Sequence, residues 1–142
     1  MAAAAHAGAG GKAQLVPATA ASPEVLLAAQ GFLFVCPENL GTMSGAMKEM
    51  FDRCYYPLLG RIEGRPYATL IAAGSDGHGA QAQIDRIVTG WRLRRVAEPH
   101  IVNLGAQTPA QIEAPKVLTE QELAHCHTLG AAMAEGIALG LF

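Results

Sequence analysis

The chain of 142 residues has the length of one domain, residues 1–142, and its 51% hydrophobic residues can form a core that is covered on several sides. Ten Lys and Arg against 12 Asp and Glu give a formal net charge of -2, which offers no electrostatic attraction for nucleic acid or an anionic membrane. The three cysteines form no C-x-x-C pair, the N-terminus is a poor match to a signal peptide, and no apolar run reaches membrane-spanning length. These features indicate a cytoplasmic protein without membrane insertion.

The first part of the chain contains two helix signals and two strand signals. Met1–Gly11 has the composition of a helix end, because its alanines are strong helix formers and its glycines suit C-cap positions. The short apolar run Ala13–Val16 is predicted to be a strand. Residues 22–24 supply an N-cap serine, a proline and an acid, which predict a short helix through Gln30. Gly31–Cys36 is apolar on both faces, as expected of a central parallel strand.

The middle of the chain continues with a helix and a strand. After Ser44 the apolar residues follow helical spacing, and Pro57 is expected to end or kink that helix. Tyr67–Ala73 is the next apolar run and predicts a third strand. The apolar stripe of the helix consists of Met47, Met50, Phe51, Cys54, Tyr55 and Leu58.

The last part of the chain repeats this alternation. A helix with an apolar stripe precedes the strand predicted at His100–Leu104, and Thr119 with Glu122 forms a capping box at the start of the last helix. Strands that alternate with helices predict an α/β fold with a parallel sheet. The stripes are Ala80, Ile84, Ile87, Val88 and Trp91 in the first helix, and Leu123, Cys126, Gly130, Met133, Ile137 and Leu141 in the last.

Two loops follow predicted strands at the end of the sheet where α/β proteins bind ligands. Residues 37–45 leave one strand and open a helix, so their backbone N–H groups could contact a planar ligand or an anion. An ordinary turn with Thr42 or Ser44 as N-cap explains the same residues. Residues 74–79 contain three glycines but lack the Lys-[Ser/Thr] ending of a P-loop, so alone they also fit an ordinary turn.

Together the two loops resemble one family. Residues 37–52 are similar to the segment P-x-x-x-G-x-[MV]-[SA]-x-x-[MF]-K-x-[FM]-x-D of flavodoxin-like NAD(P)H-dependent oxidoreductases, which include tryptophan-repressor-binding-protein-like quinone oxidoreductases and FMN reductases. Residues 74–79 fall where that family has its second flavin loop. The resemblance implies a doubly wound parallel sheet of order 2-1-3-4-5, with FMN and NAD(P)H as cofactors.

The resemblance also implies a set of site residues. Pro37 would shape the first loop, and the family more often has Thr plus an aromatic residue or Arg where this chain has Glu38 and Asn39. Glu38 would therefore put a carboxylate near the flavin edge. His78 either helps to protonate an acceptor or is a solvated loop residue. The remaining cofactor-binding candidates are Asn39, Leu40, Gly41 and Thr42 on one side of the ring and Gly74, Ser75, Asp76, Gly77, His78 and Gly79 on the other.

Matched to this family, the chain lacks the first strand. Gly31–Cys36 would be strand 3 and Ala13–Val16 strand 2, so strand 1 and the loop that holds the FMN phosphate are not found. Either Met1 is an internal start, or a short form folds with strand 2 displaced, paired to strand 3 or to another chain. We expect the 142-residue form to bind FMN weakly and an N-terminally extended form to bind it tightly.

The first hypothesis for function is an FMN-dependent NAD(P)H oxidoreductase that reduces a small acceptor such as a quinone or a flavin. A flavodoxin-type electron carrier and a cofactor-free interaction domain are the alternatives. Family members commonly form homo-oligomers, so the resemblance implies the same here. We expect no metal site, because His125, Cys126 and His127 are neighbours on a helix and point about 100° apart.

Overall fold

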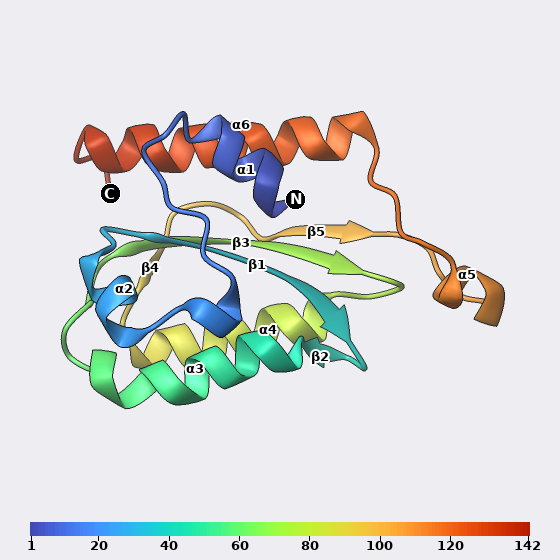
Figure 1. Cartoon of the computed structure of the whole chain (residues 1–142), viewed down its shortest axis with the longest axis horizontal. Helices are drawn as coiled ribbons and strands as arrows, with labels where there is room; N and C mark the ends of the chain where they lie inside the picture. Colours follow the sequence, from blue (N-terminus) through green and yellow to red (C-terminus); the bar gives the residue numbers. More distant parts are fainter.

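The computed structural model describes residues 1–142 as a sheet between two helical layers (Figure 1). None of its helices combines the length and the apolar character that crossing a bilayer requires. The helices are α1 (Ala2–Gly8), α2 (Pro23–Ala28), α3 (Gly45–Leu58), α4 (His78–Gly90), α5 (Pro109–Glu113) and α6 (Glu120–Ala138), with a 3-10 turn at Ala18–Ala20. The strands are β1 (Phe32–Asn39), β2 (Thr42–Met43), β3 (Pro66–Ala73), β4 (Arg94–Arg95) and β5 (His100–Asn103).

The sheet is built around β3. This strand lies between β1 on one side and β4 and β5 on the other, and all of these pairings are parallel. Its residues are nearly all buried, which explains the continuous apolar sequence of the strand. The short β2 turns back from β1 and pairs with its last two residues in antiparallel orientation.

One predicted strand is absent, and another is present but does not lie at the centre of the sheet. The predicted central strand Gly31–Cys36 corresponds to β1, which has a strand partner on one side only, except where β2 pairs with its end. Ala13–Val16 forms no strand, because it runs across the free edge of β1 instead of along it and so has no ladder to join (Figure 1). The other predicted strands, Tyr67–Ala73 and His100–Leu104, are confirmed as β3 and β5.

Helices α3 and α4 cover one face of the sheet (Figure 1). Phe51 of α3 packs between Phe34 of β1 and Trp91 at the end of α4, with ring centroids 5.3 Å apart in both pairs. Trp91, the last residue of the predicted apolar stripe, is fully buried, and its Nε1 donates a hydrogen bond of 3.0 Å to the Tyr55 carbonyl. Pro57 lies in the last turn of α3, so the helix ends one residue beyond it, at Leu58.

Helices α1 and α6 cover the other face (Figure 1). They pack closely because Gly130 of α6 has no side chain: a Cβ there would lie 1.9 Å from the Ala5 carbonyl oxygen. Cys126 is fully buried in this layer, as its place in the apolar stripe predicts. The capping box of Thr119 and Glu122 is present at the start of α6.

Candidate functional site

The carboxyl ends of β1 and β3 lie at the same edge of the sheet, because the two strands are parallel. This arrangement confirms the prediction that the loops after Cys36 and Ala73 share one edge. The segment after β5 reaches the same edge, where Ala106 N donates to the Gly74 carbonyl over 2.7 Å. Three segments that are far apart in sequence therefore form this end of the molecule.

The first loop is shorter than predicted. Strand β1 continues through Pro37 and Glu38 to Asn39, and a turn of two residues, Leu40 and Gly41, connects it to β2. Both turn residues have positive φ, 53° and 72°, as a type I′ hairpin turn requires. The prediction of a simple strand-to-helix loop over residues 37–45 is therefore wrong, and a hairpin precedes the Ser44 cap of α3.

Glu38 connects the hairpin to helix α4. Its carboxylate accepts hydrogen bonds from Gly77 N at 2.6 Å and from Ala80 N at 3.1 Å. Gly77 is the N-cap residue of α4 and has no side chain that could cap the helix, so Glu38 satisfies the first-turn amides from a distant part of the chain. The carboxylate thus points at the helix N-terminus, where the helix dipole favours negative charge.

The hairpin and α4 also touch through glycine. A Cβ at Gly79 would lie only 2.0 Å from the carbonyl oxygen of Gly41, so the two backbones approach as closely as they can. Beside them, Met43 N donates a hydrogen bond of 2.9 Å to Gln83 Oε1 of α4. The two predicted loops therefore form one continuous surface.

Asn103, at the end of β5, completes this surface although the sequence reasoning did not select it. Its Nδ2 donates to the Ser75 carbonyl over 2.6 Å, and its Oδ1 accepts from Gly105 N over 2.9 Å. The available signal was a polar residue near the carboxyl end of the predicted strand His100–Leu104. Asp76 and His78 are exposed and form no side-chain hydrogen bond, so a catalytic role of His78 stays a prediction.

Cys36 is the one thiol close to this edge. It is buried at the end of β1, and burial raises the pKa of its thiol, so the thiol stays protonated. The residue is therefore part of the core and not a nucleophile.

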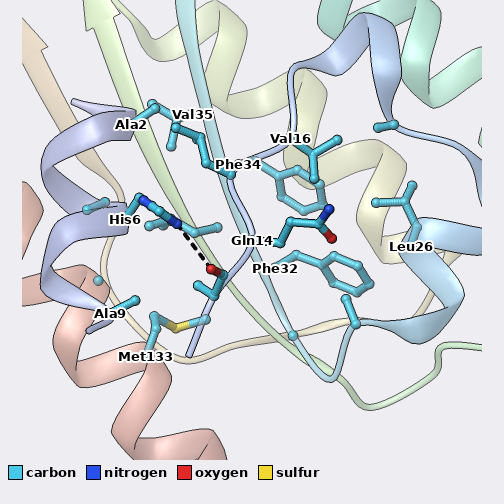
Figure 2. Close-up of a pocket in the computed structure, with 18 of the residues that line it drawn as sticks. Ala2, His6, Ala9, Gln14, Val16, Leu26, Phe32, Phe34, Val35 and Met133 are labelled. Carbon is cyan, nitrogen blue, oxygen red and sulfur yellow. Dashed lines mark hydrogen bonds between the residues drawn. The ribbon is translucent and has the colours of Figure 1, made fainter. Parts of the chain in front are cut away.

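A small cavity of about 270 Å³ lies at the carboxyl ends of the strands, and Pro37 is the only predicted site residue that lines it. Ala72, Leu104 and Lys116 are among its other residues. A larger cavity of about 520 Å³ lies along the free edge of β1, and none of the predicted site residues lines it (Figure 2). The hairpin of β1 and β2 and the glycine loop, residues 74–79, thus form an exposed rim and not a deep pocket.

Residues 6–109 match the model of a family described as NADPH-dependent FMN reductase. Among solved structures, an archaeal flavodoxin has a TM-score of 0.72 at 15% identity, over 96% of this chain and 87% of that chain. A WrbA-like flavodoxin from Agrobacterium tumefaciens has a TM-score of 0.68 at 17% identity, over 96% and 87%. Rubredoxin oxygen:oxidoreductase from Desulfovibrio gigas has a TM-score of 0.73 at 13% identity, over 99% of this chain and 33% of that chain.

At these identities the structures show a common fold, which is flavodoxin-like and α/β, as predicted. No curated protein sequence matches the chain.

Proposed function

Since the chain belongs to the NADPH-dependent FMN reductase family, we propose that it is an FMN-dependent oxidoreductase that uses NAD(P)H to reduce a quinone or a flavin. FMN supplies the redox chemistry when it is bound, because its ring accepts and donates hydride. The observation that carries the proposal is the joining of the hairpin and the glycine loop at the carboxyl edge of a parallel sheet.

The rim fits the polar edge of a planar ring. The N–H groups of Gly41, Ser75 and Asp76 form no hydrogen bond within the chain and are free to donate. A Cβ at Gly41 would meet no atom within 4 Å, so this part of the rim is open. Backbone donors beside open glycine positions suit the oxygen and nitrogen acceptors of a flavin ring.

The rim fits the phosphate of FMN less well. Helix α4 begins at this rim, and helix N-termini bind anions through their first amides. Two of these amides, those of Gly77 and Ala80, already bind the Glu38 carboxylate. The residues of this edge therefore fit the ring, and a second anion next to Glu38 is disfavoured by charge repulsion.

In this proposal the backbone holds and orients the ring, and one side chain moves a proton. Asn39–Thr42 and Gly74–Gly79 would line the two sides of the ring. The exposed His78 imidazole stands at the first position of α4 and would give a proton to a reduced acceptor. A reaction of this kind needs no nucleophile from the protein, which agrees with the protonated, buried Cys36.

The test is oxidation of NADH or NADPH by the purified chain with added FMN, first with a quinone as acceptor and then with excess free flavin. We expect turnover that depends on both the flavin and the acceptor. Gly41→Val should weaken flavin binding, because a β-branched residue disfavours a φ of 72° and crowds the rim. Flavin that is reduced and reoxidised chemically but never by NAD(P)H would contradict the enzyme and indicate a carrier. Unchanged flavin affinity in Gly41→Val would remove Gly41 from the site.

A further inference from the structure

Two buried polar side chains bind each other between the sheet and α4. Thr69, in the middle of β3, is 1% exposed, and Gln81 of α4 is 5% exposed. Apart from aromatic residues and cysteines, these are the only buried residues with a polar side chain. The Thr69 hydroxyl donates a hydrogen bond of 2.7 Å to Gln81 Oε1. Because a buried polar group without a partner costs free energy, each residue stabilises the buried position of the other.

This pair continues into a network that reaches the surface. Gln81 Nε2 donates a hydrogen bond of 2.8 Å to Asp85 Oδ1, about one turn later in α4. The same carboxylate oxygen accepts from Tyr67 Oη of β3 over 3.1 Å and forms an ion pair with Arg95 of β4. Arg95 Nε also donates to Tyr67 Oη over 3.2 Å. The network therefore joins α4 to two strands of the sheet.

A network of this kind fixes the rotation of α4 about its axis. The other buried side chains of the helix, those of Ala80, Ile84 and Val88, make apolar contacts, which have no preferred direction. A hydrogen bond does depend on direction. Adjacent helix residues point about 100° apart, so a rotation by one position would separate Gln81 from Thr69 and leave both groups buried without a partner.

The rim depends on this rotation, because α4 begins there. Gln81 N donates a hydrogen bond of 3.2 Å to the Gly77 carbonyl, so the Gln81 side chain belongs to the turn that starts at the rim. A Cβ at Gly79 would lie 2.0 Å from the Gly41 carbonyl oxygen, so this turn has little room to shift against the hairpin. His78, the first residue of α4, moves with the same turn.

We propose that Thr69 and Gln81 are positioning residues for the flavin rim, and that their hydrogen bond holds α4 in the rotation that lets the rim receive the ring. The inference rests on the proposed function. Both side chains are buried, so neither contacts the ring itself. A pair that only filled the core would be replaceable by apolar residues of the same shape without any change at the rim.

The test separates stability from flavin affinity. Thr69→Val/Gln81→Met replaces both polar groups by apolar groups of similar size, and Asp85 keeps Tyr67 and Arg95 as partners, so the midpoint of urea denaturation should stay close to that of the unchanged protein. Its affinity for riboflavin, measured by fluorescence titration, should fall at least about tenfold, because several rotations of α4 become accessible. Thr69→Ser keeps the hydroxyl and loses a buried methyl group, so it should lose stability and keep its riboflavin affinity within about threefold.

A second measurement needs no flavin. The amides of Gly77 and Ala80 bind the Glu38 carboxylate, and their hydrogen exchange should become at least about tenfold faster in the double variant and change little in Thr69→Ser. Val88, near the other end of α4, is the internal reference. Thr89→Val, at an exposed residue of the same helix, controls for the replacement of a threonine by valine.

If the unchanged protein binds riboflavin, an unchanged affinity of the double variant would overturn the proposal, because the pair would then be a replaceable part of the core. Unchanged exchange at Gly77 and Ala80 in the double variant would also overturn it. The same holds for a loss of affinity in Thr69→Ser as large as in the double variant, since affinity would then follow stability. If the unchanged protein does not bind riboflavin, the proposed function fails, and amide exchange alone decides whether the pair positions this end of α4.

Discussion

Glu38 Oε2 accepts a hydrogen bond of 2.6 Å from the backbone N–H of Gly77, a residue 39 positions later in the chain. This bond joins the end of β1 to the start of α4, and Glu38 Oε1 adds a second bond to Ala80 N. A carboxylate that replaces a missing N-cap in this way orients the helix and closes its N-terminus to other anions.

Replacement of Glu38 tests this connection. We expect Glu38→Ala to lower the free energy of unfolding by about 1–2 kcal/mol, because it removes the cap of α4 and leaves two amides without a partner. Glu38→Gln keeps one acceptor and should lose less. Urea denaturation measures both, and amide exchange at Gly77 and Ala80 should accelerate more than elsewhere. Glu98→Ala, at an exposed residue without a hydrogen bond, is the control. A Glu38→Ala variant as stable as this control would show that the carboxylate contributes no stability.

The contact between Gly79 and Gly41 leads to a second prediction. Gly79→Ala places a methyl group 2.0 Å from a backbone oxygen, so the hairpin and α4 must separate, which should cost about 1–3 kcal/mol and weaken flavin binding. Gly45→Ala is the matched control, because its Cβ meets nothing within 4 Å and alanine favours the first turn of α3. Thermal denaturation and a flavin titration should separate the two variants. Equal behaviour would mean that the hairpin adapts freely.

The occupied N-terminus of α4 leads to a prediction about ligands. If the rim binds the flavin ring while Glu38 takes the amides of Gly77 and Ala80, the 5′-phosphate of FMN gains no contact there. We therefore expect the 142-residue chain to bind FMN weakly, and riboflavin with an affinity within about threefold of it. Fluorescence titration with both flavins is the measurement. FMN that binds tightly and in stoichiometric amount would show that another part of this chain holds the phosphate.

The stability of the protein should depend on His100. Its ring stacks on His125 at 3.9 Å, and its buried Nε2 has no hydrogen-bond partner. Burial lowers the pKa of His100 below its ordinary 6.5 and the neighbouring His125 lowers it further, while Glu122 opposes the shift. The unfolded chain therefore binds the proton more readily than the folded protein. The stability is complete above pH 6.5 and is lost as the pH falls below 6.5 through the lower pKa of His100 in the folded protein.

The loss of stability is measured as the midpoint concentration of urea denaturation at several pH values between about pH 8 and pH 5. The carboxylates with lowered pKa, among them Glu49 and Glu122, titrate from 4.5 downward and add little in this window. His100→Phe keeps an aromatic ring on His125 and removes the titrating group, so its midpoint should change less with pH. If the urea midpoint changes equally with pH in the unchanged protein and in His100→Phe, another group causes the pH dependence.

The sequence by itself determined the elements whose signals are local. Ser44 and Thr119 cap helices where their hydroxyls can accept from the first turn. Strand β3 is apolar except for Thr69, because both of its faces are covered. These patterns depend on residues a few positions apart, so they can be recognised before the chain is folded. The alternation of strands and helices predicted a parallel sheet in the same way, and a parallel sheet places the candidate site at the carboxyl ends of its strands.

The tertiary structure decided what depends on distant partners. Ala13–Val16 is as apolar as a strand but crosses β1 instead of pairing with it, since a strand needs a neighbour that its own sequence does not specify. The prediction that Glu38 lies near the flavin edge could not include its bonds to Gly77 and Ala80, because the two segments approach only when β1 and β3 pair in register. The two-residue β4 was missed for the same reason, because it forms only beside β3. The short α5 was missed although its signal is local: Thr108 and Gln111 form a capping box with Pro109 at the first helical position.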